Sequence, residues 1–324
     1  MNVLRKIYVL LCLAAVCCEC FCQETDHAPS YQTVLMNNPA MSGSGETGSV
    51  RLSYLNFYPG NGYNLHSLYL TYDSYFKAIN GGAAFYLAED YLGGHVNNFR
   101  SGISYSYFLQ AGEDLYINAG LTASVFHRGF NFTNSLLPDQ INVAGGAAYP
   151  SSELLRSSGQ TVFDIGTGIA FKSGRFSGGL AVLHLSEPDL SPESSMPEDI
   201  IKRKLYMHLC GDFPAGNQGK LFVRPIMFSG VQDGFFIAGA GASFEHEHIA
   251  VNAITMDDSA GNLNLQAGFS LQAGYVRLNY SYRFNVASDN LLLPLSMLHQ
   301  AGIVFRLNNF DKRRQSNTIK FPEL

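Results

Sequence analysis

The chain has 324 residues, a formal net charge of −5 at pH 7 and 46% hydrophobic residues. Because no basic stripe interleaved with aromatic side chains is present, nucleic acid is not expected as a partner. Beyond the N-terminal leader, no segment reaches the roughly 18 to 20 continuous apolar residues that a transmembrane helix requires. If the protein spans a membrane, it therefore spans it as strands.

Residues 1–22 have the pattern of a secretory signal peptide. Two basic residues precede an apolar stretch, Ile7 to Val16, and Cys20-Phe21-Cys22 is interpreted as the cleavage site, so the mature chain is predicted to begin near Gln23. The alternative, a lipoprotein, would need an acylated leader cysteine, but the residues before these cysteines make a poor lipidation box. Five of the six cysteines lie in this leader, so cleavage leaves only Cys210 and no intramolecular disulfide.

Residues 23–47 are predicted to form a periplasmic N-terminal segment. Pro39 fixes its own backbone and favours an extended Asn38, while Gly43 permits a turn that is closed to other residues. The run from Gly43 to Gly48 matches G-x-G-x-x-G, but it precedes a strand instead of following one, so no nucleotide site is predicted. Two interpretations of Asn38 and Pro39 stay open, an ordinary entry into the first strand and docking to a partner.

Residues 48–307 are predicted to form an all-β fold, an antiparallel transmembrane β-barrel of the outer membrane. Apolar residues alternate with polar or small ones from Leu115 to Val125, Leu263 to Gln272 and Val276 to Val286. This alternation gives each strand one apolar and one polar face, and many such strands behind an export signal are typical of a barrel. About fourteen strands are predicted, at 49–58, 65–75, 81–89, 99–110, 114–127, 162–172, 175–184, 201–213, 219–230, 234–244, 248–257, 262–272, 275–286 and 297–307.

The predicted connections sort by length. Those after even-numbered strands are tight, whereas the long loops at 128–161, 185–200 and 287–296 all follow odd-numbered strands. Outer-membrane barrels have short periplasmic turns, long extracellular loops and periplasmic termini, and this chain follows the same rule. Tyrosines near strand ends, such as Tyr54 and Tyr69, are expected in interfacial girdles. The alternative is a secreted β-sandwich or propeller whose apolar face points inward to a core.

Candidate sites for chemistry are weak. His246-Glu247-His248 could offer two imidazoles to a metal, but a solvated turn is the better interpretation. His184 and His208 are expected to be wall residues, because no serine or acidic partner is identifiable for them. Cys210 is expected to be a buried, inert thiol. The sequence therefore predicts no enzyme, no metal site and no cofactor.

Three other segments are candidates for recognition. The loop at 128–161 exceeds the roughly 12 to 15 residues of an ordinary connection, and is expected either to enter the lumen or to meet a partner outside. The loop at 185–200 is expected to present an acidic surface. Residues 308–324 form a predicted periplasmic tail, in which Lys312, Arg313 and Arg314 are either solvated or a handle for acidic periplasmic partners.

Several short motifs stand in a fixed order along the chain, namely Asn38-Pro39-Ala40-Met41-Ser42-Gly43, Phe163 to Phe171, Phe176 to Leu185 with its His-Leu ending, Lys202 to Leu209 and Leu221 to Pro225. In this order they resemble the PorP/SprF-like outer-membrane proteins of the type IX secretion system of Bacteroidetes. The chain departs from that family's first-strand Arg-x-Gln-Trp element at Leu52 to Tyr58, and from its late Trp and Tyr-Arg positions at Ala240 to Glu245.

The resemblance implies a non-enzymatic outer-membrane component of type IX secretion, which acts in secretion or surface anchoring of cargo through protein–protein contacts, in a system also linked to gliding motility. The implied partners are type IX secretion components or a secreted surface protein, with outer-membrane lipid around the barrel and peptidoglycan-associated periplasmic proteins as further candidates. The alternative is an outer-membrane channel for small solutes, which needs an open lumen. The residues predicted to bind a partner are Asn38, Pro39, Ala40, Gly43, Lys312, Arg313 and Arg314.

Overall fold

A computed structural model describes residues 33–45, 47–57, 65–131, 158–191, 199–215, 220–288, 297–307 and 319 of the chain. The predicted signal peptide at 1–22, most of the loop at 128–161 and the three basic tail residues Lys312, Arg313 and Arg314 lie outside these residues. In the part of the chain that is described, no helix is long and apolar enough to cross a membrane.

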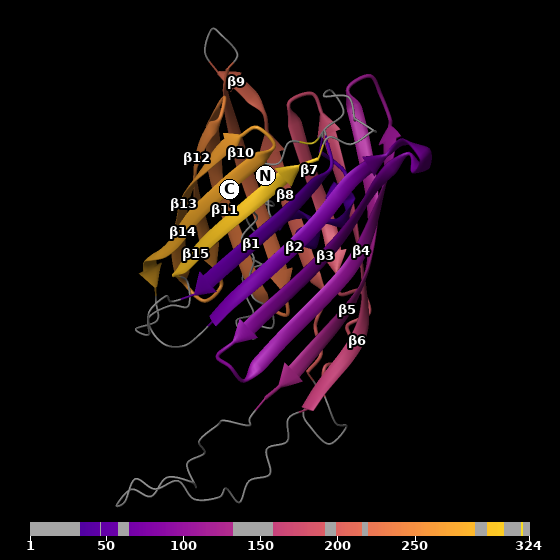
Figure 1. Ribbon diagram of the computed structural model, residues 1–324, viewed down its shortest axis with the longest axis vertical. Helices are drawn as coiled ribbons and strands as arrows, with labels where there is room; N and C mark the ends of the chain where they lie inside the picture. Colours follow the sequence, from indigo (N-terminus) through magenta and orange to yellow (C-terminus); the bar gives the residue numbers. More distant parts are fainter. Residues whose placement is uncertain are drawn as a thin grey trace, which may run out of the picture.

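The strands form one antiparallel sheet that closes on itself (Figure 1). Each strand pairs with the next, β15 pairs with β1, and the short β9 continues β8 along β10. With β8 and β9 counted as one interrupted strand, the barrel has fourteen strands, which confirms the prediction. The strands are β1 (Ser49–Phe57), β2 (Leu65–Phe76), β3 (Gly81–Leu92), β4 (Val96–Gln110), β5 (Leu115–Phe130), β6 (Ser158–Ser173), β7 (Phe176–Leu183), β8 (Lys204–Gly211), β9 (Phe213–Ala215), β10 (Leu221–Gln232), β11 (Phe235–His246), β12 (Ile249–Asp258), β13 (Asn262–Ala273), β14 (Val276–Ser288) and β15 (Leu298–Arg306).

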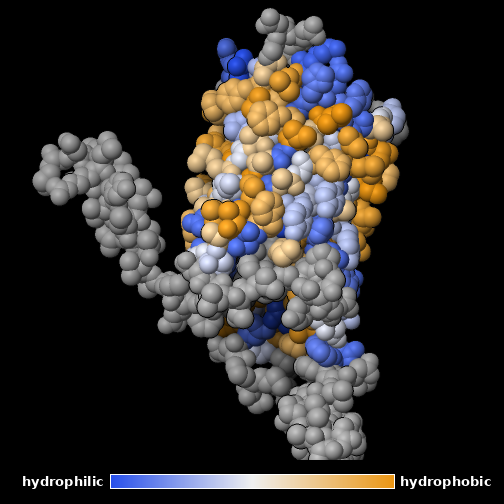
Figure 2. All heavy atoms as spheres, turned by 90° about the vertical axis from the view of Figure 1, so that its left-hand side faces the viewer, coloured by the Kyte–Doolittle hydropathy of each residue, from blue (hydrophilic) through white to orange (hydrophobic). Residues whose placement is uncertain are grey.

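The alternation in the sequence decides which side chains line the lumen. In β5, Leu121 and Val125 are exposed on the outer face, whereas Asn118, Gly120 and Ser124 are buried on the inner face. Figure 2 shows hydrophobic side chains over much of the outer face, with hydrophilic residues gathered toward the two ends. An apolar belt between polar rims is the surface that a barrel presents to lipid.

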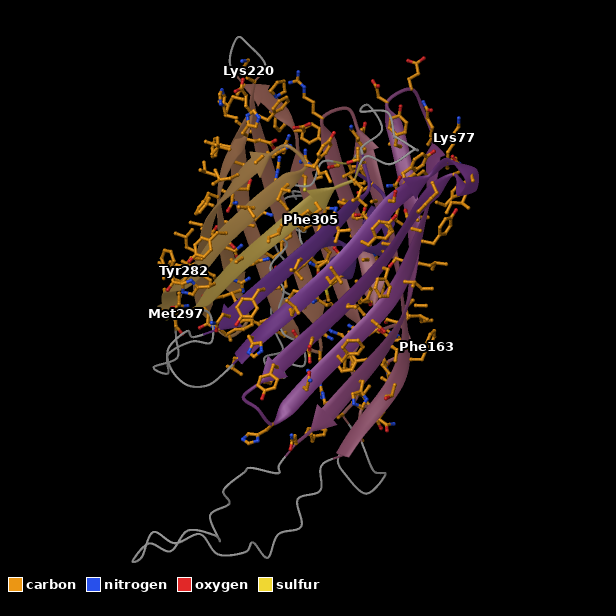
Figure 3. All side chains as sticks on the ribbon, in the orientation of Figure 1. Lys77, Phe163, Lys220, Tyr282, Met297 and Phe305 are labelled. Atoms are coloured by element: carbon orange, nitrogen blue, oxygen red, sulfur yellow. The ribbon has the colours of Figure 1, made fainter. Side chains whose placement is uncertain are left out.

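The two ends of the barrel differ in their connections, and we call them the short-turn end and the long-loop end. The short-turn end carries the tight connections β2–β3, β4–β5, β6–β7, β11–β12 and β13–β14, together with the start of β1 and the end of β15. In Figure 3, Lys77 and Lys220 mark this end and Met297 marks the opposite one. The long connections β5–β6, β7–β8 and β14–β15 all lie at the long-loop end, so the predicted sorting of loops is found in the structure.

Two tyrosines predicted for an interfacial girdle lie on opposite faces of the sheet. Tyr54 is 42% exposed on the outside. Tyr69 is 1% exposed on the inside and donates a hydrogen bond to Asp90 Oδ1 at 2.7 Å. Arg100 completes this buried cluster, with its Nη2 atom 2.9 Å from Asp90 Oδ2. The girdle prediction is therefore wrong for Tyr69, because its position in β2 faces the lumen.

The described part of the predicted periplasmic segment at 23–47 lies inside the barrel. Val34, Ala40 and Met41 are at most 5% exposed. They belong to one hydrophobic cluster with wall residues such as Ile226 and Ile254. A segment expected next to the barrel is thus part of its interior.

Candidate functional site

Residues 33–44, here called the plug, form two short helices inside the barrel. The α-helix α2 (Val34–Asn37) and the 3-10 helix η1 (Pro39–Met41) meet at Asn38, whose backbone is extended at φ −150° and ψ 110°. This conformation is the one that a residue before proline prefers. The Asn38 Oδ1 atom accepts the Ala40 N–H at 2.9 Å and so caps η1. The Asn-Pro-Ala motif therefore builds the turn of the plug.

Glycines on the inner wall make room for the plug. A Cβ added at Gly120 of β5 would lie 2.3 Å from Ala40 N. The corresponding distances are 2.2 Å from Gly168 of β6 to Asn38 Oδ1, and 2.5 Å from Gly179 of β7 to Asn38 Nδ2. Real Cβ contacts are essentially never shorter than 3.0 Å. These three glycines, here called the glycine seat, therefore allow a close approach that a larger residue would block.

Hydrogen bonds from the wall fix the plug on the glycine seat. Ser106 Oγ and Asn118 Nδ2 both donate to the Ala40 carbonyl oxygen, at 3.0 and 3.3 Å. The Asn38 Nδ2 atom donates to the Ile169 carbonyl oxygen at 3.3 Å. Each bond of this kind contributes about 0.5 to 1.5 kcal/mol. Hydrogen bonds and close packing on the glycine seat therefore act together to hold the plug.

A buried carboxylate anchors the end of the plug that leads into β1. Asp73, 1% exposed, accepts the Gly43 N–H at 2.9 Å, the Ser49 hydroxyl at 2.8 Å and Arg51 Nη1 at 2.6 Å. Gly43 has a φ of +62°, which favours glycine at this turn. The ion pair therefore joins β1 to β2, and the bond from Gly43 to the same carboxylate fastens the plug to them.

The C-terminal segment also reaches the plug. Ile319 donates its backbone N–H to the Ser44 carbonyl oxygen at 3.1 Å. Its side chain is 5% exposed and belongs to the same cluster as Val34 and Leu35. Ile319 and the plug are thus in contact inside the barrel.

A second element enters the lumen from the long-loop end. Residues 184–191 and 199–203, here called the strap, form a hairpin in which Leu190 N donates to Asp199 O and Ile201 N to Pro188 O, both at 3.0 Å. Leu190 and Ile201 are 0% and 2% exposed and pack with Phe126 of the inner wall. The loop at 185–200 was expected to present an acidic surface; Asp189 of its described part is exposed while Leu190 turns inward, and residues 192–198 lie outside the described residues, so that surface stays a prediction.

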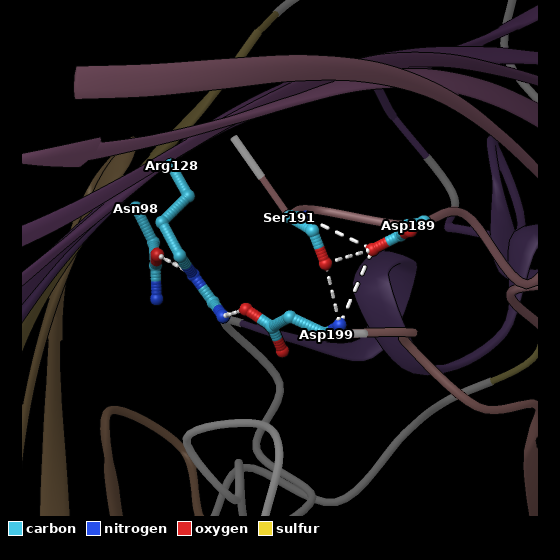
Figure 4. Close-up of polar contacts among 5 residues, drawn as sticks. All are labelled: Asn98, Arg128, Asp189, Ser191 and Asp199. Carbon is cyan, nitrogen blue, oxygen red and sulfur yellow. Dashed lines mark hydrogen bonds and ion pairs between the residues drawn. The ribbon is translucent and has the colours of Figure 1, made fainter. Parts of the chain in front are cut away.

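Polar contacts hold the strap in place (Figure 4). Arg128 Nη1 forms an ion pair with the Asp199 carboxylate, and Arg128 Nε donates to Asn98 Oδ1 at 2.8 Å. Within the strap, Asp189 Oδ1 accepts the Ser191 hydroxyl at 2.6 Å and the Ser191 N–H at 2.9 Å. These two bonds lower the pKa of the Asp189 carboxyl.

Between plug and strap lies a cavity of about 30 Å³ with both polar and apolar lining, which is room for about two water molecules. Residues from the plug, the wall and the root of the strap all line it, among them Leu35, Met36, Asn37, Arg100, Asp164, His184 and Lys204.

His184 has an acidic partner that sequence reasoning did not find. Its Nδ1 atom lies 2.7 Å from Asp164 Oδ2, and Ser186 Oγ donates to Asp164 Oδ1 at 2.8 Å. A nucleophilic serine needs a base in hydrogen-bond contact with its hydroxyl, but the Ser186 hydroxyl bonds the carboxylate instead of the imidazole. The group therefore fastens the root of the strap, where His184 has a φ of +56°.

The remaining candidates for chemistry are structural. His246 and His248 flank an exposed turn in which Glu247 pairs with Lys220 at 2.6 Å, and this contact lowers the pKa of Glu247. No group of three His, Cys, Asp or Glu side chains in the described ranges could hold a metal ion. His208 and Cys210 are 5% and 3% exposed in the wall, where the sequence placed them.

The predicted partner-binding residues fall into two groups. Asn38, Pro39, Ala40 and Gly43 are buried against the barrel wall. Their binding to a partner stays a prediction that requires the plug to leave. Lys312, Arg313 and Arg314 lie outside the described residues. The glycine seat was missed, although glycines at inward positions of three neighbouring strands were visible in the sequence.

A solved structure shows the same fold at low sequence identity, and others are similar to this chain. The P. putida toluene transporter TodX is 11% identical, with 86% of this chain and 94% of that chain covered and a TM-score of 0.51. The Acinetobacter baumannii outer membrane protein Omp33 is 10% identical, with 82% and 100% covered and a TM-score of 0.46. No curated protein shows significant sequence similarity to the chain.

A family model gives the more specific result. The model described as type IX secretion system membrane protein PorP/SprF matches residues 30–300, a span that includes the plug, the glycine seat and the strap. This confirms the resemblance of the short motifs. The chain is an outer-membrane β-barrel and belongs to the PorP/SprF family of type IX secretion system membrane proteins.

Proposed function

We propose that the protein is a non-enzymatic component of type IX secretion, which acts in the secretion or surface anchoring of cargo through protein–protein contacts. Family membership over residues 30–300 carries this proposal. The partners we expect are type IX secretion components or one secreted surface protein. By the rule for outer-membrane barrels, the short-turn end faces the periplasm and the long-loop end the outside.

The occupied lumen supports a role in recognition over a role in conduction. The plug is seated on β5, β6 and β7, and the strap packs against Phe126 at the other end of β5. A closed sheet with a filled interior is a rigid support, so loops and termini are the parts that present surface to partners. A channel for small solutes would need both elements to move.

Affinity capture tests the proposal directly. The full chain with a C-terminal tag is solubilised gently from the outer membrane of its native host, and co-purifying proteins are identified by mass spectrometry against a tagged outer-membrane barrel of unrelated function. Enrichment of secretion components, or of one large surface protein, is the expected result. Recovery of the barrel alone would contradict both forms of the proposal.

Conductance of the purified protein in planar bilayers distinguishes the proposed role in secretion from the alternative, a channel for small solutes. We expect no stable conductance from the unmodified chain, because the plug and the strap occupy the lumen. Steady single-channel currents from the unmodified protein, with no partner captured, would favour the channel.

A further inference from the structure

The plug and the strap contact the inward faces of the same two strands, on either side of inward residues that line the cavity. On β6, Gly168 contacts the plug, Asp164 bonds His184 and Ser186 of the strap, and Val162 packs in the strap cluster. Between these contacts, Gly166 faces the cavity that separates the plug from the strap.

The neighbouring strand β5 repeats the arrangement. Its inward residues run from Gly120 under the plug to Phe126 under the strap and Arg128, which holds Asp199. Phe126 also lies between two cations, with the guanidinium carbons of Arg100 and Arg128 each 5.7 Å from its ring centroid.

The cavity is lined by both elements, the strap contributing its root residue His184. Leu35, Met36 and Asn37 of the plug form one side of it, and His184 with its neighbour Leu183 contributes to the other. Asn37 is 2% exposed, and its Nδ2 atom has no hydrogen-bond partner among the described residues. If the strap left, this cavity would open to water, which would solvate the Asn37 amide and remove one wall from the buried Leu35.

We propose that the plug and the strap form one coupled closure of the lumen, so that release of the strap at the long-loop end weakens the seating of the plug, and displacement of the plug loosens the strap. A protein that draws the strap outward is thereby sensed at the short-turn end. Coupling between two sites is reciprocal by thermodynamic necessity, and this reciprocity distinguishes one coupled closure from two independent ones.

Two cysteine reporters measure how accessible the plug and the strap are to a maleimide, in the full-length protein reconstituted in lipid vesicles. Ser42→Cys reports on the plug and Leu190→Cys on the strap, since both positions are 0% exposed. The native Cys210 is buried, and the parent protein gives its background labelling by a maleimide. Heat-modifiable migration in gels shows that each variant still forms a barrel.

Arg128→Ala removes a contact that holds the strap and none that holds the plug, and Asp199→Asn, which leaves the bond from Arg128 to Asn98 in place, is a milder second variant in case the first does not fold. We expect either change to raise the labelling rate of Ser42→Cys at least fivefold. The matched control is Lys220→Ala, which breaks an exposed ion pair at the short-turn end and should leave labelling unchanged.

Gly168→Ala perturbs the plug alone, because its Cβ would lie 2.2 Å from Asn38 Oδ1. We expect at least a fivefold rise in the labelling rate of Leu190→Cys, with Gly129→Ala as control, since its Cβ has no neighbour closer than 3.6 Å. If each variant exposes only its own element, the coupling is overturned, while the proposed role in secretion is untouched.

Discussion

Replacing Gly120 by alanine should lift the plug off the wall. The added Cβ would lie 2.3 Å from Ala40 N and 2.4 Å from the Pro39 carbonyl carbon. Both are backbone atoms, so no side-chain rotation can relieve the contact. Ordinary van der Waals contact begins at 3.4 Å, and the plug must therefore move away by about 1.1 Å, the difference from 2.3 Å, to avoid overpacking.

This movement breaks the hydrogen bonds that the wall donates to the plug. The Ala40 carbonyl oxygen accepts from Ser106 of β4 at 3.0 Å and from Asn118 of β5 at 3.3 Å, and a shift of about 1.1 Å along these bonds would take both distances beyond hydrogen-bonding range. At about 0.5 to 1.5 kcal/mol each, the loss is about 1 to 3 kcal/mol. The unseated population should rise by about 5- to 150-fold.

The labelling rate of Ser42→Cys measures this population when opening and closing are fast relative to labelling. Gly129→Ala on the same strand is the matched control, because its Cβ meets His127 Nε2 only at 3.6 Å. If Gly120→Ala folds into a barrel and labels as slowly as Gly129→Ala, the plug does not rest on the glycine seat.

The remaining predictions concern the anchor, the strap and the buried tyrosine. Asp73→Ala should lower the free energy of unfolding by about 3 to 5 kcal/mol, because it breaks the buried pair with Arg51; urea unfolding followed by circular dichroism measures this, and a loss below about 1 kcal/mol would contradict it. Tyr69→Phe removes a bond to a buried carboxylate and should cost about 1.5 to 3 kcal/mol in the same assay; no loss would mean that the bond contributes nothing net. Since the pKa of Asp189 is lowered, its contribution is complete above its ordinary pKa and is lost as pH falls through the lowered one. The ratio of the Leu190→Cys labelling rates with and without Asp189→Asn, in which the common effect of pH on the thiol cancels, should therefore be constant from pH 8 to pH 5 and approach one only in stronger acid, below about pH 4; a ratio that already approaches one near neutral pH would refute this.

The barrel was predictable because its signal is local. Alternation in β5 from Leu115 to Val125 fixes which face each side chain takes, and the sorting of loop lengths fixes the end at which each connection lies. The girdle prediction for Tyr69 was wrong because an aromatic side chain can lie either in an outer girdle or in the lumen. Only its register in β2 decides between them.

The plug was not predictable from its own sequence. Residues 33–44 are too short to show a period, and their place depends on wall residues far along the chain, such as Gly120, Gly168 and Gly179. The partner of His184 is likewise set by the register between β6 and the strap, which brings Asp164 to it. Such contacts depend on the register between strands, and no local pattern in a single sequence specifies that register.

The contact between Ser44 and Ile319 has a consequence for the order of folding. The plug precedes β1 in the chain, yet its seat is formed by β5, β6 and β7, and one of its bonds is made by Ile319, which follows β15. Contacts between such distant residues form slowly, since chain closure entropy opposes them. The pairing of β1 with β15 then encloses a segment that was made first, so the barrel is expected to close around its plug, and a chain shortened before Ile319 is expected to complete this last stage poorly.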